Sequence, residues 1–92
     1  MTKPFKCYND SGHGWVAVKR QLLSELNILD KITQFSYQKG QTVYLEEDQD
    51  ATTFIGAYVA KYGEKPTYIS KYTNKSSPIR SYDHFNANYY KS

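Results

Sequence analysis

Cysteine is almost absent from this sequence of 92 residues, in which Cys7 is the single example. An internal disulfide framework is therefore excluded, and Cys7 can supply at most one ligand to a zinc site. Long apolar runs are missing too, because no stretch approaches the ~18 residues that a membrane-spanning helix needs. Residues 1–8 lack the apolar segment of a signal peptide, so we expect a soluble protein of the cytoplasm.

Catalytic motifs are equally scarce. No serine, cysteine or threonine stands in a nucleophile motif, and the sequence contains no phosphate-binding loop, dinucleotide fingerprint or paired set of zinc ligands. We therefore expect a protein that is not an enzyme and that carries no cofactor and no metal ion.

Charge of one sign does not dominate, since 12 lysines and arginines stand against 9 acids for a net charge of +3. Within residues 46–50 lies what we call the acidic cluster: Glu46, Glu47, Asp48 and Asp50. The flanking stretches are basic. A DNA mimic would be acidic throughout, whereas a dedicated nucleic-acid binder usually gathers its bases on one face. The scattered bases of this chain select neither class.

Aromatic residues are plentiful, at 16% of the chain with ten tyrosines and four phenylalanines. Together with the other hydrophobic residues they supply enough apolar bulk for one core, and a chain of this length is one domain. Ten tyrosines cannot all be buried in so small a domain, so several lie on the surface. Surface tyrosine is typical of protein interfaces, because a rigid ring offers contact area at little cost in entropy.

The first half of the chain predicts a strand, a helix and a hairpin. Gly12-His13-Gly14 is a turn, and residues 15–18 follow it as a short apolar strand. In residues 19–27 the apolar period changes to that of a helix, which Asn27 can close in the left-handed conformation. Residues 32–44 alternate on both sides of a Lys-Gly turn, as expected of a hairpin.

The second half predicts another helix and another strand. The helix begins at Asp48 or Asp50, whose carboxylates favour the positive end of the helix dipole, and it ends at Gly63. Residues 67–73 alternate with bulky side chains on both faces, which indicates an edge strand. Residues 79–82 could add a few further paired residues.

The resulting order of strand, helix, strand, strand, helix, strand predicts an α+β fold in which a small antiparallel sheet carries two helices on one face. This is the split βαβ order of ferredoxin-like domains (βαββαβ), and a smaller sheet with another strand order is the alternative. We expect an N-terminal arm at residues 1–11 that docks through Phe5 and Tyr8, a single domain at residues 12–85 and a frayed C-terminal tail at residues 86–92.

Three local features are candidates for a functional site. His13 lies between two glycines, and a histidine side chain can act as an acid, a base or a ligand; alternatively, it only caps a tight turn. The acidic cluster could bind a cation, but it lacks the central glycine of a calcium loop, which favours a role as helix N-terminal charge. Arg80 stands among hydroxyl side chains and could grip a carboxylate or phosphate; the alternative is an ion pair with Glu46 or Glu47.

The proposed strand order brings these features together. The first and third strands are antiparallel neighbours, so the turn before the first lies near the acidic cluster after the third. We therefore predict that His13, Glu47 and Arg80 cluster at one edge of the domain. A half-buried Glu47 would need a cationic or hydrogen-bonding partner there. The cluster is either a structural ion-pair network or a recognition pocket.

Four segments of the chain resemble a family of small proteins that are carried by phages and plasmids. They are Gly12-His13-Gly14-Trp15, Phe35-Ser36-Tyr37, Tyr44-Leu45-Glu46-Glu47-Asp48 and Ser77-Pro78-Ile79-Arg80-Ser81-Tyr82. The resemblance extends over residues 8–82. It assigns no functional residue, but it implies a context, since small single-domain proteins of mobile elements often bind and disable a host factor, including CRISPR and restriction machinery.

Two functions follow from these observations. The first is a phage or mobile-element accessory protein of the anti-defence or anti-CRISPR kind, which binds a host protein complex and modulates or inhibits it. Its predicted binding residues are His13, Trp15, Glu47, Asp48, Arg80 and Tyr82. The alternative is a nucleic-acid-binding accessory domain, with predicted contacts at Lys61, Lys65, Lys71, Lys75, Tyr68 and Tyr72. A hydrolase or metal site centred on His13 is a third hypothesis.

Overall fold

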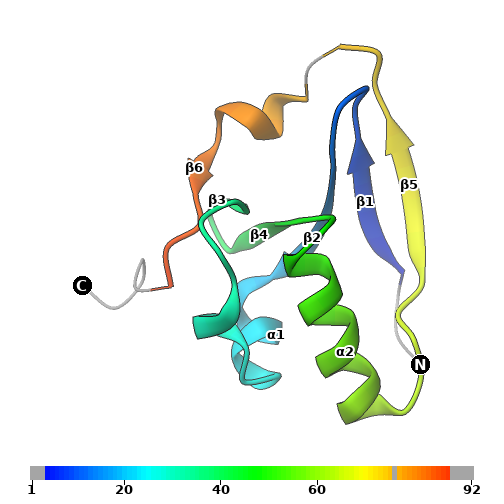
Figure 1. Cartoon of the computed structure of the whole chain (residues 1–92), viewed down its shortest axis with the longest axis vertical. Coiled ribbons are helices and arrows are strands. Elements are labelled where there is room, and N and C mark those ends of the chain that lie inside the picture. The colour runs from blue at the N-terminus through cyan, green and yellow to red at the C-terminus, as the bar shows by residue number, and fades with distance from the viewer. Residues whose placement is uncertain (1–3, 76, 88–92) are drawn as a thin grey trace.

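The computed structural model describes residues 4–75 and 77–87 and has a mixed α+β fold, which confirms the predicted class (Figure 1). Its strands are β1 (Phe5–Asn9), β2 (Gly14–Lys19), β3 (Tyr37–Lys39), β4 (Thr42–Glu46), β5 (Tyr68–Tyr72) and β6 (Asp83–His84). Its α-helices are α1 (Arg20–Glu25) and α2 (Asp50–Tyr62), and its short 3₁₀ helices are η1 (Leu29–Lys31) and η2 (Pro78–Ser81).

The strands form one sheet in the order β5-β1-β2-β4-β3-β6. The first and third predicted strands, β2 and β4, are antiparallel central neighbours, with Val16 opposite Leu45. Their pairing confirms the strand contact on which the predicted site depended. The second and third predicted strands, β3 and β4, form the expected hairpin, and β5 is the edge strand that residues 67–73 predicted.

The segment predicted to be an N-terminal arm differs from that expectation, because Phe5–Asn9 forms strand β1 inside the sheet. It pairs antiparallel with β2 and parallel with β5, so the sheet is mixed rather than wholly antiparallel. The Phe5 side chain attaches this segment to the core. Its ring packs edge-on against Phe54, with centroids 5.2 Å apart, and against Tyr58 at 5.8 Å.

Both α-helices cover the same face of the sheet, as predicted. The core between them and the strands consists mainly of aliphatic side chains from β2, β4 and α1 and aromatic side chains from α2: Val16, Val18, Val43, Leu45, Leu23, Leu26, Phe54 and Tyr58. Helix α1 ends near the predicted residue, with Asn27 at a φ of 60°, and α2 is closed by Gly63 at a φ of 75°. None of the helices in the described ranges is long and apolar enough to cross a membrane.

The C-terminal segment returns to the sheet instead of fraying at residue 86. Residues predicted as a further paired segment form η2, and β6 follows it to pair with β3. The buried side chain of Gln38 then accepts hydrogen bonds from Arg20 at 3.1 Å and from the backbone N–H of Asn86 at 2.9 Å. The Arg20 guanidinium lies 5.1 Å from the centre of the Phe85 ring. The rest of the predicted tail, residues 88–92, lies outside the described residues.

The opposite face of the sheet, which we call the open face, carries no α-helix of the described ranges. Since successive side chains of a strand alternate, the register places Tyr8, Trp15 and Tyr44 on this face, while their neighbours Cys7, Val16 and Val43 face the helices. The segment of residues 77–82 lies against part of the open face, where the Tyr44 and Tyr82 rings are 5.2 Å apart.

Candidate functional site

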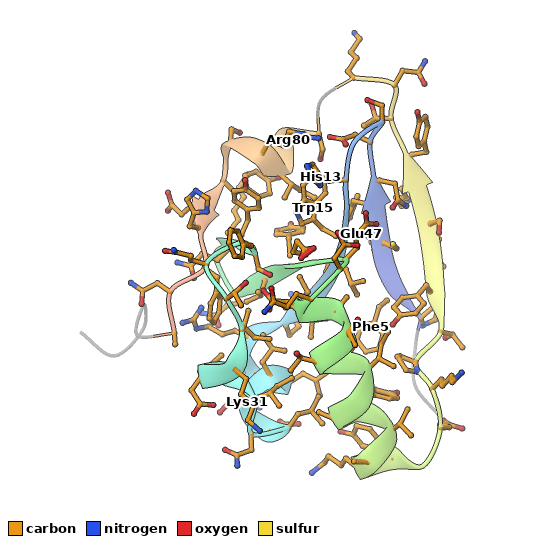
Figure 2. The ribbon with its side chains drawn as sticks, in the orientation of Figure 1. Phe5, His13, Trp15, Lys31, Glu47 and Arg80 are labelled. Carbon is orange, nitrogen blue, oxygen red and sulfur yellow. The ribbon has the colours of Figure 1, made fainter. Side chains whose placement is uncertain are left out.

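A cavity of about 430 Å³ opens where the turn before β2 meets the loops around β3 and β4. We call it the His13 pocket; its lining residues are His13, Trp15, Phe35, Tyr37, Glu46, Asp48, Gln49 and Arg80. Four of the six predicted binding residues are in that set. Figure 2 shows His13, Trp15, Glu47 and Arg80 at the same end of the sheet, although they come from segments far apart in the sequence.

Asp10, which the sequence analysis does not identify, connects the turn before β2 to the segment before η2. Its side chain is 1% exposed, and both of its oxygens accept hydrogen bonds. Oδ1 accepts from the backbone N–H groups of Gly12 and His13, each at 2.9 Å, which fixes the turn. Oδ2 accepts from the backbone N–H of Ser77 at 2.9 Å, which fixes the segment before η2. The Asp-Ser-Gly order is a turn signal that could have identified it.

Arg80 forms its ion pair with Asp10, and not with Glu46 or Glu47 as one of the two alternatives expected. Its Nε lies 2.7 Å from Oδ2 of Asp10, and a second guanidinium nitrogen lies 2.9 Å from Oδ1. The guanidinium carbon is 5.6 Å from the centre of the Trp15 ring, within the range of a cation–π contact. The Arg80 guanidinium and the backbone of Ser77 hold the pKa of the Asp10 carboxyl well below its usual range, and the same ion pair raises the pKa of Arg80.

Glu47 lies at the predicted end of the sheet but outside the pocket. Its backbone N–H donates to the carbonyl of Gly14 at 3.1 Å, and its carboxylate lies so close over Gly14 that a Cβ there would collide with it. Glycine at position 14 therefore permits the close approach. The side chain of Glu47 is exposed, whereas the neighbouring Glu46, which alternation directs to the other face beside Trp15, lines the pocket.

The acidic cluster supports the local backbone. Glu46 accepts hydrogen bonds from the N–H of Asp48 at 2.6 Å and from that of Gln49 at 3.2 Å, and it thereby fixes the loop before α2. Asp50, the first residue of α2, is fully buried. Asp50 is the acid of the first turn of α2, where a negative charge is favourable, but the N-cap residue Gln49 makes no side-chain cap. Within the ranges that the structure describes, no group of three or more His, Cys, Asp and Glu residues is placed to hold a metal ion.

Phe35 is an exposed ring of the pocket, with 65% of the residue accessible to solvent. The loop of residues 33–36 presents it, and Asp50 fixes that loop. Oδ2 of Asp50 accepts from the backbone N–H of Thr33 at 3.0 Å, from the Thr33 hydroxyl at 2.7 Å and from the Ser36 hydroxyl at 2.5 Å. The sequence pattern predicts Phe35 in the hairpin strand, whereas the structure has it in the loop before β3, which buried polar contacts fix.

Tyr82 belongs to a second cavity, of about 230 Å³, and not to the His13 pocket. Three tyrosines meet there, because the Tyr44 ring contacts both Tyr82 and Tyr8, with centroids 5.2 and 6.0 Å apart. Burial, followed by the neighbouring hydroxyls of Tyr82 and Tyr8, raises the pKa of Tyr44. Lys39 covers the Tyr82 ring at 4.8 Å from its centre.

The residues predicted for nucleic-acid binding do not form one surface. Lys61 lies on α2, Lys65 and Lys75 lie outside the strand, and Lys71 lies on β5. Register places Tyr68 and Tyr72 on the helix side of β5, since Ser70 lies opposite Cys7, while Lys71 faces the open side opposite Tyr8. Lys71 and the two tyrosines therefore point to opposite faces of β5, although Lys71 and Tyr72 both line the second cavity.

The charge balance of the His13 pocket is negative. Asp10 neutralises Arg80, while Glu46 and Asp48 add two carboxylates to the lining. The rings of Trp15, Phe35 and Tyr37 form the apolar part of the wall, and His13 lies against Trp15 with ring centres 6.0 Å apart. Aromatic faces combined with carboxylates suit a cationic group such as a lysine or arginine side chain.

Comparison with known proteins finds no match: no family model, no curated protein and no solved structure is similar to this chain.

Proposed function

We propose that this chain is a protein-binding accessory protein of a phage or other mobile element, acting in the host cytoplasm by binding and modulating or inhibiting a host complex. A defence system such as CRISPR or restriction machinery is the kind of target that we propose. The observation that supports binding is the His13 pocket with Phe35 exposed at its rim. Binding, rather than catalysis, is the activity that this arrangement of rings and hydrogen-bonded charges suits.

The pocket also suggests how a partner would be held. A basic side chain of the partner would enter between the rings and meet Glu46 and Asp48, while Phe35 would pack against apolar surface around it. The contacts of the basic side chain strengthen when water is excluded, because cation–π contacts and ion pairs are stronger in a desolvated site. The fixed loops reduce the entropy lost on binding.

Replacing Phe35 with alanine should weaken partner binding by about 2 kcal/mol, roughly 30-fold in Kd, because an exposed anchor ring is lost without disturbing the core. Tyr62→Ala is the matched control, since Tyr62 is also an exposed aromatic, at 42%, but lies on α2. A host protein captured from lysate in stoichiometric amount by the wild type is then titrated against each variant by calorimetry. Equal affinity for Phe35→Ala, or capture of nucleic acid alone, would contradict the proposal.

Single-stranded nucleic acid is a second candidate ligand, favoured by a groove of about 570 Å³ on the open face. Lys6 lies opposite Ala17 on β1, Lys19 follows Ala17 by two residues on β2, and the rings of Tyr8 and Tyr44 lie next to them. Lysines that contact phosphates beside rings that stack on bases are the usual elements of such a site. These residues differ from those that the sequence predicted.

If this second function is correct, Lys6→Ala/Lys19→Ala should lower affinity for a short single-stranded oligonucleotide by roughly 10-fold at low salt. The slope of log affinity against log salt concentration should also become less steep by about one to two, because one or two phosphate contacts are lost. Lys61→Ala/Lys65→Ala removes the same charge elsewhere and should change the affinity little. Fluorescence anisotropy over a range of ionic strength measures both. Undetectable binding of the wild type at low salt would rule this function out.

A further inference from the structure

Strand β5 has an outer edge that pairs with no strand of the described chain. The sheet order places β5 at one end, beside β1 alone (Figure 1). All five of its residues are exposed, and three of them are large and apolar: Tyr68 at 38%, Ile69 at 49% and Tyr72 at 66%. A strand of this length with exposed apolar side chains is a template for pairing with another chain.

The existing hydrogen bonds show which backbone groups face outward. The N–H of Phe5 donates to the carbonyl of Thr67 at 2.9 Å, and the N–H of Thr73 donates to the carbonyl of Asn9 at 3.0 Å. In a parallel ladder the residues that bond to the neighbouring strand alternate. The odd-numbered residues of β5 therefore bond to β1, and Tyr68, Ser70 and Tyr72 direct their N–H and carbonyl groups toward the open edge.

These three residues are symmetric about Ser70, because the strand reads Tyr-Ile-Ser-Lys-Tyr. When a second copy lies antiparallel with Ser70 opposite Ser70, each Tyr68 lies opposite the Tyr72 of the other copy. Every outward N–H and carbonyl of the two strands then has a partner. Lys71 lies opposite Ile69, so the only charged residue of the strand does not meet its own copy.

We propose that β5 is the interface of a homodimer, in which two copies pair antiparallel around a two-fold axis at Ser70 and join their sheets into one. The tyrosine pairs on either side of the axis lie on the same face of the sheet and pack across the interface, as aromatic cross-strand pairs do. A two-fold contact of this kind closes on itself and does not extend into fibres.

The dimer leaves the His13 pocket free. Strands β1 and β2 separate β5 from β4 and β3, which carry Glu46 and Tyr37 of the pocket. Each dimer therefore presents two pockets, and a partner with two recognition elements would gain avidity from binding both. The proposal of a dimer does not depend on the proposed partner, because it concerns the purified protein alone.

Light scattering and sedimentation velocity on the purified full chain test the dimer. We expect a mass of twice 10.7 kDa that falls to the monomer on dilution. Ser70→Pro removes an N–H that faces the open edge and not β1, so it should abolish the dimer while the monomer stays folded. Ser70→Ala keeps the N–H and should remain dimeric.

Two further variants keep the proposal falsifiable if proline disturbs the fold. Ser70→Lys places two like charges opposite each other at the axis and should weaken the dimer at least 10-fold, with partial recovery at high salt. In a Cys7→Ser background, which removes the thiol opposite position 70 on β1, Ser70→Cys should form a covalent dimer under mild oxidation, whereas Ser24→Cys on α1 should not. A monomer at all concentrations, or a dimer that both Ser70→Pro and Ser70→Lys leave intact, would overturn the interface.

Discussion

Replacing Asp10 with asparagine should destabilise the protein almost as much as replacing it with alanine, with a fall in Tm of roughly 10 °C or more for both. Asparagine has nearly the same shape as aspartate, so a small effect is the usual expectation. Here both carboxylate oxygens accept hydrogen bonds, from Gly12, His13 and Arg80 at Oδ1 and from Ser77 and Arg80 at Oδ2. An amide must direct its NH₂ group at donors in either orientation.

The pH dependence of stability follows from the same contacts. The pKa of Asp10 in the folded protein lies well below its usual value of 3.8. Its contribution is therefore fully present above pH ~4, where both the folded and the unfolded chain are ionised, and is lost as the pH falls below ~4 because only the unfolded chain takes up the proton. The difference in stability between wild type and Asp10→Asn should be large at pH 7 and shrink toward pH 3.

Denaturant unfolding at pH 7, 5 and 3 measures this difference. Asp30→Asn is the matched control, since Asp30 is an exposed aspartate in η1, and its effect should be small at every pH. An Asp10→Asn protein as stable as the wild type at pH 7, or a stability difference that grows toward pH 3, would contradict the role of Asp10.

The elements that could be predicted from the sequence are those with strong local signals. Helix α2 has acids before its first turn, Gly63 at its end and apolar residues at helical spacing, and the structure has it at Asp50–Tyr62. Strand β1 has a weaker signal, because Pro4, Asn9 and Asp10 flank a short segment that also contains Lys6. Besides its hairpin with β2, it is held by pairing with β5, more than fifty positions away in the chain, and by the Phe5 ring on Phe54. No local pattern encodes such a contact.

The candidate site shows the same limit. The His13 turn and the acidic cluster lie at one end of the sheet as predicted, because the β2–β4 pairing determines that geometry, and Arg80 reaches the same end through its ion pair with Asp10. The sequence did not predict the ion-pair partner of Arg80, because Asp10 lies 70 positions earlier and resembles an ordinary turn residue. The sequence pattern predicts Glu47 as a binding residue, whereas the structure has Glu46 in the pocket wall. The two differ because a shift of one residue moves a side chain to the opposite face of a strand.

Asp50 is a buried aspartate of the opposite kind, in which one oxygen makes all the contacts. Its Oδ2 accepts three hydrogen bonds from Thr33 and Ser36, whereas its Oδ1 has no hydrogen-bond partner among the described residues. Asp50→Ala should therefore cost about 3–5 kcal/mol, because three donors lose their acceptor in a site that is closed to water. That is a large part of the roughly 5–14 kcal/mol expected for a domain of this size.

Asp50→Asn should restore part of that loss, because its amide oxygen can take the place of Oδ2, while its NH₂ group replaces the unpartnered Oδ1 and gains no acceptor there. Asparagine thus discriminates between the two buried aspartates, being tolerated better at position 50 than at position 10. Denaturant unfolding measures both pairs of variants. Since Asp50 also fixes the loop that presents Phe35, partner binding should survive in Asp50→Asn and weaken in Asp50→Ala even where that protein stays folded. An Asp50→Asn protein as unstable as Asp50→Ala would show that the negative charge at the start of α2, and not the hydrogen bonds to the loop, is what the fold requires.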